Sequence, residues 1–134
     1  MPTYNIPERQ FYKDLPISFN AHPQTGDVRP LVNDEAVKRA LKNLLFTNRG
    51  ERFFNYRFGT DIRKILFEPI SPGTTVALRE IIEEAIRQYE PRVALVDVTV
   101  EPNEDQNLVD VVIIFQIANA IDPITLEVTL ERIR

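Results

Sequence analysis

The chain has 134 residues, 43% hydrophobic and 27% charged, which matches one globular domain that needs no disulfide or metal to bury a core. It has no cysteine and one histidine, His22, which excludes disulfide frameworks, thiol nucleophiles and cysteine-based metal sites. Residues 1–70 carry 11 basic and 8 acidic side chains, net +3, whereas residues 71–134 carry 5 and 12, net -7. This asymmetry favours docking between differently charged neighbours over general polyanion binding.

The first 32 residues are predicted to form a proline-rich arm. Five of the ten prolines fall in the first 30 residues, where a fixed φ and missing donors oppose regular structure. A short edge hairpin around the turn Thr25-Gly26-Asp27 is the one regular element expected there. The start of the chain shows no basic region followed by an apolar core, so no secretory signal is expected.

Residues 33–134 are predicted to form a single α+β domain that begins with helices. One helix starts at Asn33 or Asp34 and runs to about Thr47. A short helix follows Thr60, and the longest covers about 74–89, capped by Ser71 or Thr74. The stripe of this longest helix comprises Leu78, Ile81, Ile82, Ala85, Ile86 and Tyr89. Its opposite side is charged, so we expect it to be half buried.

After Pro91 the hydrophobic period changes from 3.6 to 2, which predicts strands. The first is expected to place Ala94, Val96, Val98 and Val100 on one face. The second, 108–117, is apolar on both faces, so we expect it to be central and covered on both sides. The third, from 124 to the end, alternates regularly. The predicted fold class is α+β, with amphipathic helices on one face of a mainly antiparallel sheet that ends in a three-strand meander.

No residue set predicts catalysis, a metal or a cofactor. His22 lacks a second ligand and is typical of a surface histidine, and neither Ser18 nor Ser71 has a nucleophile setting. The alternative of a glycan hydrolase stays open, because acid pairs are defined by their separation in space. Glu51 and Glu68, which flank aromatic-rich sequence, are its best candidates.

The stretch from Arg49 to Lys64 interleaves arginines with aromatic residues. One interpretation is a nucleic-acid-binding module that stacks on bases and holds phosphates. The other is that the aromatic rings fill the core under the sheet while the arginines pair with acids on a neighbouring chain. The overall acidity of the chain weakens the first interpretation.

The segment YEPRV, residues 89–93, ends the longest helix. Tyr89 completes the apolar stripe and Pro91 prevents continuation, but a helix stop needs neither Glu90 nor Arg92. A rigid turn that holds an acid beside a guanidinium suits a clamp for another chain, since little conformational freedom remains to be lost on docking.

In order, the motifs AVKRALKNLLFTNRGERFF, FGTDIRKILFEPISPGT and YEPRV resemble the baseplate wedge proteins of contractile-tailed bacteriophages, which include a type VI secretion baseplate component. The resemblance covers about residues 30–134. It implies a structural subunit, not an enzyme, in which Glu90, Pro91 and Arg92 dock on a helical bundle of partner wedge subunits. Glu51 and Arg52 match the family's G-E-R, either as intramolecular pairs or as wedge contacts.

The resemblance also implies a second partner, the first ring of tail sheath subunits, for which the sheet edge would serve as a template. The expected location is the virion tail baseplate, assembled in the host cytoplasm. No nucleic acid, membrane or small-molecule partner is expected. Some family members are labelled lysozyme-like, but the residues here offer no acid pair that supports carrying this activity over.

Overall fold

The computed structural model describes residues 13–14, 21, 23–24, 26–27, 31–117 and 122–132. The chain divides into two compact units, Met1–Arg39 and Ala40–Arg134. Helix α1 (Asp34–Phe46) begins in the first unit and ends in the second. The division into an arm of residues 1–32 and a domain of residues 33–134 stays a prediction.

In the first unit, β1 (Lys13–Asp14) pairs antiparallel with β2 (Leu31–Val32). Gly26 has a φ of +68°, as expected for the glycine of a turn. Most of the predicted hairpin, with His22, Ser18 and Thr25, lies outside the described residues.

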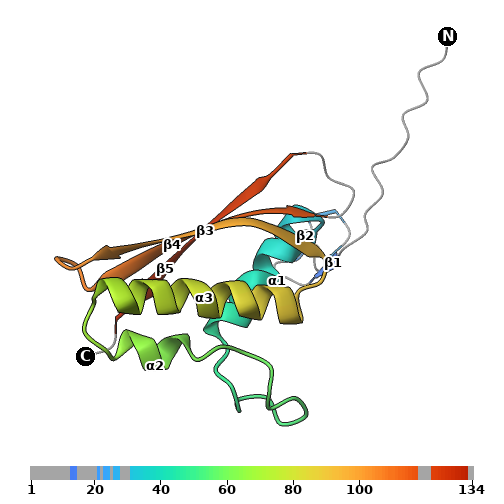
Figure 1. The fold of residues 1–134 in the computed structure, drawn as a ribbon. Coiled ribbons are helices and arrows are strands. Elements are labelled where there is room, and N and C mark those ends of the chain that lie inside the picture. Colours follow the sequence, from blue (N-terminus) through green and yellow to red (C-terminus); the bar gives the residue numbers. More distant parts are fainter. Residues whose placement is uncertain are drawn as a thin grey trace. The chain divides into compact units, whose positions relative to one another are not determined.

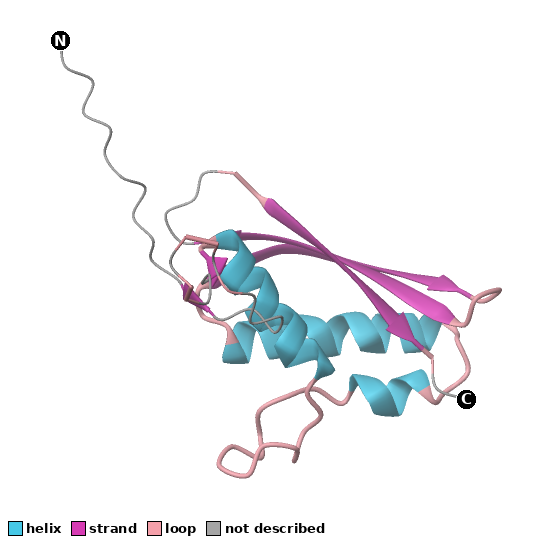
Figure 2. Ribbon diagram, turned by 180° about the vertical axis from the view of Figure 1, so that it is seen from behind, coloured by secondary structure: helices cyan, strands magenta, loops and turns pink. Residues whose placement is uncertain are grey.

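The second unit contains an antiparallel sheet with the strand order β3 (Val93–Asn103), β4 (Leu108–Ile117), β5 (Ile124–Glu131). Helix α3 (Pro72–Tyr89) lies along one face of this sheet, and the short helix α2 (Ile62–Leu66) lies beside α3 (Figures 1 and 2). The predicted α+β class and the three-strand meander are confirmed.

Helix α3 begins at a capping box. The Ser71 hydroxyl accepts from the Thr74 N–H at 3.2 Å, and the Thr74 hydroxyl accepts from the Ser71 N–H at 2.8 Å. Pro72 occupies the first turn, where its missing N–H leaves no helical bond unmade. The cap therefore belongs to Ser71, and the helix starts two residues before the predicted position.

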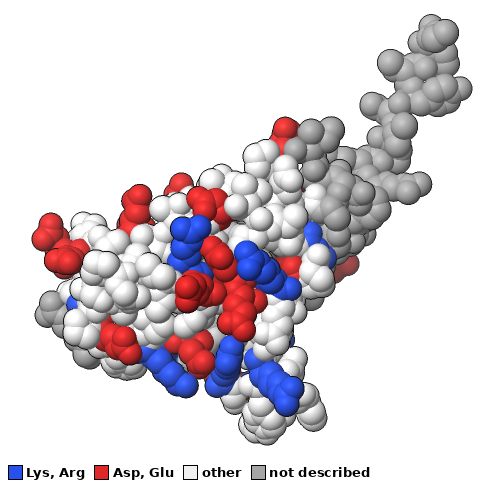
Figure 3. All heavy atoms as spheres, in the orientation of Figure 1, with Lys and Arg blue, Asp and Glu red and all other residues white. Residues whose placement is uncertain are grey.

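The buried stripe of α3 comprises Thr74, Leu78, Ile82, Ala85 and Ile86. Its outer side carries interspersed charges of both signs (Figure 3). Arg79 donates to Glu83 at 2.9 Å and to Asp97 of β3 at 3.2 Å, which links the helix to the sheet. The hydrogen bond and the charge of Glu83 raise the pKa of Arg79, so it stays cationic at any physiological pH.

Strand β4 is central, as predicted, but its two faces differ. The residues buried on the helix-covered face are Val109, Val111, Ile113, Phe115 and Ile117. The residues of the other face, Leu108, Asp110, Val112, Ile114 and Gln116, are only half-buried. The predicted cover on both sides is wrong in this respect: the helix α3 lies on one face, and the other is shielded only in part.

The predicted alternation along β3 is wrong in its first half. The register with β4 shifts between Leu95 and Asp97, which leaves Val96 as the extra residue of a β-bulge. Val93 and Val98 are buried, whereas Val96 is 58% exposed. One inserted residue reverses the inward and outward positions of the residues before it, so Val93 replaces Ala94 and Val96 on the inner face.

Candidate functional site

The turn after α3 is held by its own charges. Glu90 is the last residue of the helix cap, and its N–H donates to the Ile86 carbonyl at 3.0 Å. Arg92 donates through Nε to Glu90 Oε1 at 2.5 Å and through Nη2 to Oε2 at 2.8 Å. Both carboxylate oxygens of Glu90 therefore face a single guanidinium in a two-pronged pair.

Burial separates the roles of the two charged residues. The Glu90 side chain is 9% exposed and that of Arg92 is 32% exposed, while Pro91 between them is exposed. We predicted an acid beside a guanidinium in a turn that docks on a partner, and this docking role stays a prediction. The carboxylate of Glu90 is buried and already paired with Arg92, so what the turn presents at the surface is Pro91 and the outer part of Arg92.

The segment 48–59, which we name the aromatic loop, projects away from α2 and α3 (Figures 1 and 2). Phe53 is 81% exposed, Phe54 is fully exposed and Tyr56 is 62% exposed. The interpretation that these rings fill the core under the sheet is therefore wrong. One feature of the sequence is consistent with an exposed loop: the aromatic residues lie between two glycines, Gly50 and Gly59, and not within a helix or strand pattern.

The base of the aromatic loop is ordered by three contacts. The Phe58 ring meets Tyr89 edge to face with centroids 5.2 Å apart, and the Arg52 guanidinium lies 3.9 Å from the Phe58 centroid. The Tyr89 hydroxyl donates to the Arg57 carbonyl. The loop is therefore attached to the residue directly before the Glu90–Arg92 turn.

Glu51 and Arg52, the other two predicted contact residues, make intramolecular contacts but not with each other. Glu51 accepts from the Asn48 side-chain amide at 2.6 Å, and Arg52 covers Phe58. Both remain exposed at the surface. These two contacts stabilise the aromatic loop within the chain. A role of Glu51 and Arg52 in binding a partner stays a prediction.

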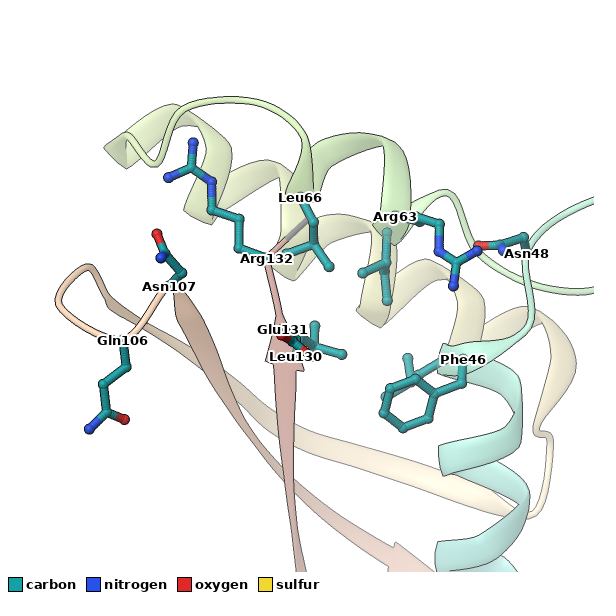
Figure 4. A pocket seen from close by; sticks show the side chains of 11 residues that line it. Phe46, Asn48, Arg63, Leu66, Gln106, Asn107, Leu130, Glu131 and Arg132 are labelled. Carbon is teal, nitrogen blue, oxygen red and sulfur yellow. The ribbon is translucent and has the colours of Figure 1, made fainter. Parts of the chain in front are cut away.

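A cavity of about 650 Å³ lies beside the end of β5 (Figure 4). Its apolar lining comes from Leu45 and Phe46 of α1, Ile62 and Leu66 of α2, and Leu130 of β5. Its polar lining comprises Asn48, Arg63, Gln106, Asn107, Glu131 and Arg132. This cavity does not follow from the sequence, because its walls come from four separate segments.

The acids proposed for glycan hydrolysis do not line this cavity. Glu51 and Glu68 are both exposed, and Glu68 borders a second, much smaller hollow of about 10 Å³. Within the described part of the chain, no group of three or more histidine, aspartate or glutamate side chains is placed to hold a metal ion. None of the described helices is both long and apolar enough to span a bilayer.

The basic residues of the predicted nucleic-acid surface are partly neutralised. Asp61 pairs with Arg49 at 3.5 Å and with Lys64 at 3.2 Å. Arg52 covers an aromatic ring of its own chain. Fewer positive charges are thus available for phosphates than the sequence count suggests, which lowers the expected nonspecific affinity.

Comparison with known proteins identifies the family of this chain. The family model described as baseplate wedge protein gp25 matches residues 32–121. The baseplate wedge protein gp25 of Enterobacteria phage T4 is 34% identical over 98 residues, which cover 73% of this chain and 74% of that protein. This chain belongs to the gp25 family of baseplate wedge proteins. The resemblance that the sequence motifs indicated is confirmed.

Solved structures share the fold of this chain. A chain in the baseplate of the anti-feeding prophage is 29% identical with a TM-score of 0.69, covering 82% of this chain and 88% of that one. A protein of Geobacter sulfurreducens, provisionally named a tail lysozyme, shares the fold at 24% identity with a TM-score of 0.68, over 73% and 89%. The fold recurs in the type VI secretion baseplate complex at 23% identity with a TM-score of 0.59, over 70% and 88%.

Proposed function

We propose that this chain is a structural subunit of a contractile-tail baseplate, and that Pro91 and Arg92 form its contact with partner wedge subunits. The observation that carries the proposal is the two-pronged pair between Arg92 and the buried Glu90. The T4 relative is a baseplate wedge protein, and the anti-feeding prophage relative is part of a baseplate.

The geometry of the turn suits docking on a preformed surface such as a helical bundle. Pro91 fixes one backbone angle, and Glu90 holds the Arg92 guanidinium in a defined direction. A side chain that is already ordered loses less entropy on binding than a mobile one. On this proposal Glu90 positions Arg92, and Arg92 and Pro91 contact the partner.

The proposal locates the chain in the virion, in the tail baseplate, after assembly in the host cytoplasm. It requires no catalytic residue, metal or cofactor. The hydrolase and nucleic-acid alternatives gain no specific support, since Glu51 and Glu68 do not line the cavity beside β5 and the basic stretch is partly neutralised.

The test substitutes Arg92→Lys, with Arg87→Lys as the matched control. Lysine keeps the charge beside Glu90 but loses the planar fork. Arg87 is an exposed arginine on α3 that also pairs with a glutamate, Glu83, at 3.6 Å. We expect both proteins to fold and only Arg92→Lys to enter baseplates at least about tenfold less, measured by co-purification with wedge subunits. Normal incorporation of Arg92→Lys would contradict the proposal.

The second proposed contact is between the edge of β5 and the first ring of sheath subunits. Among the described strands, β3 and β5 are the two edges of the sheet. Strand β3 carries a bulge at Val96 and a proline at Pro102, both of which discourage further pairing. Strand β5 is regular from Ile124 to Glu131, so we expect it to be the edge that accepts a strand.

A further inference from the structure

The tip of the aromatic loop carries an apolar surface with no role inside the described fold. Phe53, Phe54 and Tyr56 are neighbours in sequence, and each is more than half exposed. Apolar residues scattered singly over a protein surface are normal and need no explanation. A contiguous exposed group of aromatic residues, in contrast, marks an interaction surface.

The loop is held in shape despite this exposure. Gly50 donates through its N–H to the Tyr56 carbonyl at 2.9 Å, which closes the loop upon itself. Asn48 and Thr60 form a β-bridge below it, and Thr60 donates to the Leu45 carbonyl at 3.1 Å. An ordered loop presents its tip with little entropy left to lose, as a binding anchor requires.

The charge balance decides which kind of partner fits. The aromatic loop, residues 48–59, contains Arg49, Arg52 and Arg57 against Glu51, a net charge of +2, and Asp61 follows it closely. Arg49 pairs with Asp61, and Arg52 covers Phe58. A polyanion or an anionic membrane surface would find little net positive charge here, so binding has to come from burial of the rings.

We propose that Phe53 and Phe54 insert into an apolar pocket on a second protein subunit of the baseplate, with a carboxylate or carbonyl at its rim that accepts from Arg57. Buried aromatic residues with a neighbouring arginine are the usual energetic centre of a protein interface. Arg57 is exposed and makes no ion pair among the residues described. This inference rests on the proposed function, because it takes the partner to be a baseplate subunit.

The position of the loop agrees with that choice of partner. Phe58 packs on Tyr89, and the Tyr89 hydroxyl donates to the Arg57 carbonyl. Tyr89 is the last residue of α3 and precedes the Glu90–Arg92 turn. The aromatic loop is therefore continuous with the turn that the proposed function assigns to wedge contacts.

Two measurements on assembled particles test the inference. First, the photoreactive amino acid p-benzoylphenylalanine replaces Phe54 in the full chain, purified particles are irradiated, and the cross-linked peptide is identified by mass spectrometry. We expect the cross-link to fall on apolar residues of one identified baseplate subunit. Cross-links confined to DNA, to lipid or to a second copy of this chain would overturn the inference.

Second, the double variant Phe53→Ser/Phe54→Ser is compared with Val76→Ser, an exposed apolar residue of α3 outside the loop. Neither should change the unfolding midpoint, because none of these side chains is buried. We expect the double variant to enter particles at least about tenfold less and Val76→Ser to enter normally. Equal incorporation of the two variants would overturn the inference.

The outcomes separate this inference from the function on which it rests. If wild-type protein were absent from purified baseplates, the proposed function itself would be wrong. If wild-type and double-variant proteins were both present in normal amounts, and Arg92→Lys were depleted, the aromatic anchor alone would be wrong.

Discussion

Glu90 is a buried carboxylate whose two oxygens both accept from Arg92, at 2.5 and 2.8 Å. Glu90→Gln keeps the size of the side chain but removes the charge and one acceptor. We expect the free energy of unfolding to fall by about 2 kcal/mol, because hydrogen bonds to charged groups contribute about 1.5–3 kcal/mol. Urea denaturation measures the loss, and Glu84→Gln on the exposed side of α3 is the control. Equal stability of both variants would show that the pair contributes nothing to folding.

Gly59 closes the base of the aromatic loop, where only a glycine fits. Its φ is +119°, and a Cβ there would lie 2.5 Å from the Thr47 carbonyl oxygen, which is backbone and cannot turn aside. Gly50 has a φ of +90° but open space around it. We expect Gly59→Ala to lower the free energy of unfolding by about 3 kcal/mol or more, through steric overlap added to strain.

Gly50→Ala is the matched control for this substitution, because it carries the backbone strain without the overlap. We expect it to cost about 1–2 kcal/mol in the same urea titration. If the two alanine variants lost the same stability, the contact of Gly59 with the 47–48 backbone would be unimportant.

At the scale of the element, the cap of α3 offers a clean test. The Ser71 hydroxyl accepts from the Thr74 N–H, a bond that alanine cannot replace. We expect Ser71→Ala to lower the free energy of unfolding by about 1 kcal/mol and Ser71→Asp to remain near wild type. Thermal unfolding compares the three proteins. A loss of the same size in Ser71→Asp would mean that the serine acts through something other than its cap.

The elements themselves follow from sequence because their periods are long and regular. The stripe of α3 and the alternation of β5 each repeat over several turns or pairs, and both are found as expected. The bulge at Val96 does not follow, since one extra residue leaves an alternating pattern looking intact. Burial from Val93 to Val96 is therefore misassigned although the strand is found.

The geometry of the candidate site also could not be predicted in full from the sequence, for a different reason. Sequence singled out Glu90 and Arg92, because a helix stop needs neither residue. A rigid turn at Pro91 predicts that the two charges lie side by side, but the two-pronged geometry of the pair and the burial of Glu90 appear only in the fold. For Phe53 and Phe54, hydrophobicity indicates a core by default, and only the fold shows that the rings point outward.

Across the whole molecule, charge is divided by segment. Residues 93–131, which contain the sheet, hold eight acidic side chains and no lysine or arginine, whereas residues 48–64 hold five basic and two acidic ones. The predicted charge asymmetry between the two halves of the chain therefore corresponds to two regions of the fold. The segment that contains the sheet is acidic, and the aromatic loop together with helix α2 is mildly basic. A strand that joins the sheet is expected to be basic, because the opposite charge steers its approach.

The edge of β5 can be tested through its backbone. Arg132 donates through its N–H to the Asn107 carbonyl at 2.9 Å, in register with the β4–β5 ladder. Hydrogen-bonded and non-hydrogen-bonded pairs alternate in an antiparallel ladder, so the N–H groups of Thr125, Glu127 and Thr129 point to the outer edge. These are the donors that an incoming sheath strand would use.

Glu127→Pro removes one of these outward donors and leaves the bonds to β4 intact. Proline is tolerated on an edge strand at such a position, so we expect a stability loss of only about 1 kcal/mol. Baseplates should incorporate the variant and yet carry no sheath in electron micrographs, whereas Glu127→Ala, which keeps its N–H, should give sheathed tails. Thr125→Pro repeats the test at a second outward N–H. Sheathed tails at normal yield with both proline variants would mean that the sheath attaches elsewhere than at β5.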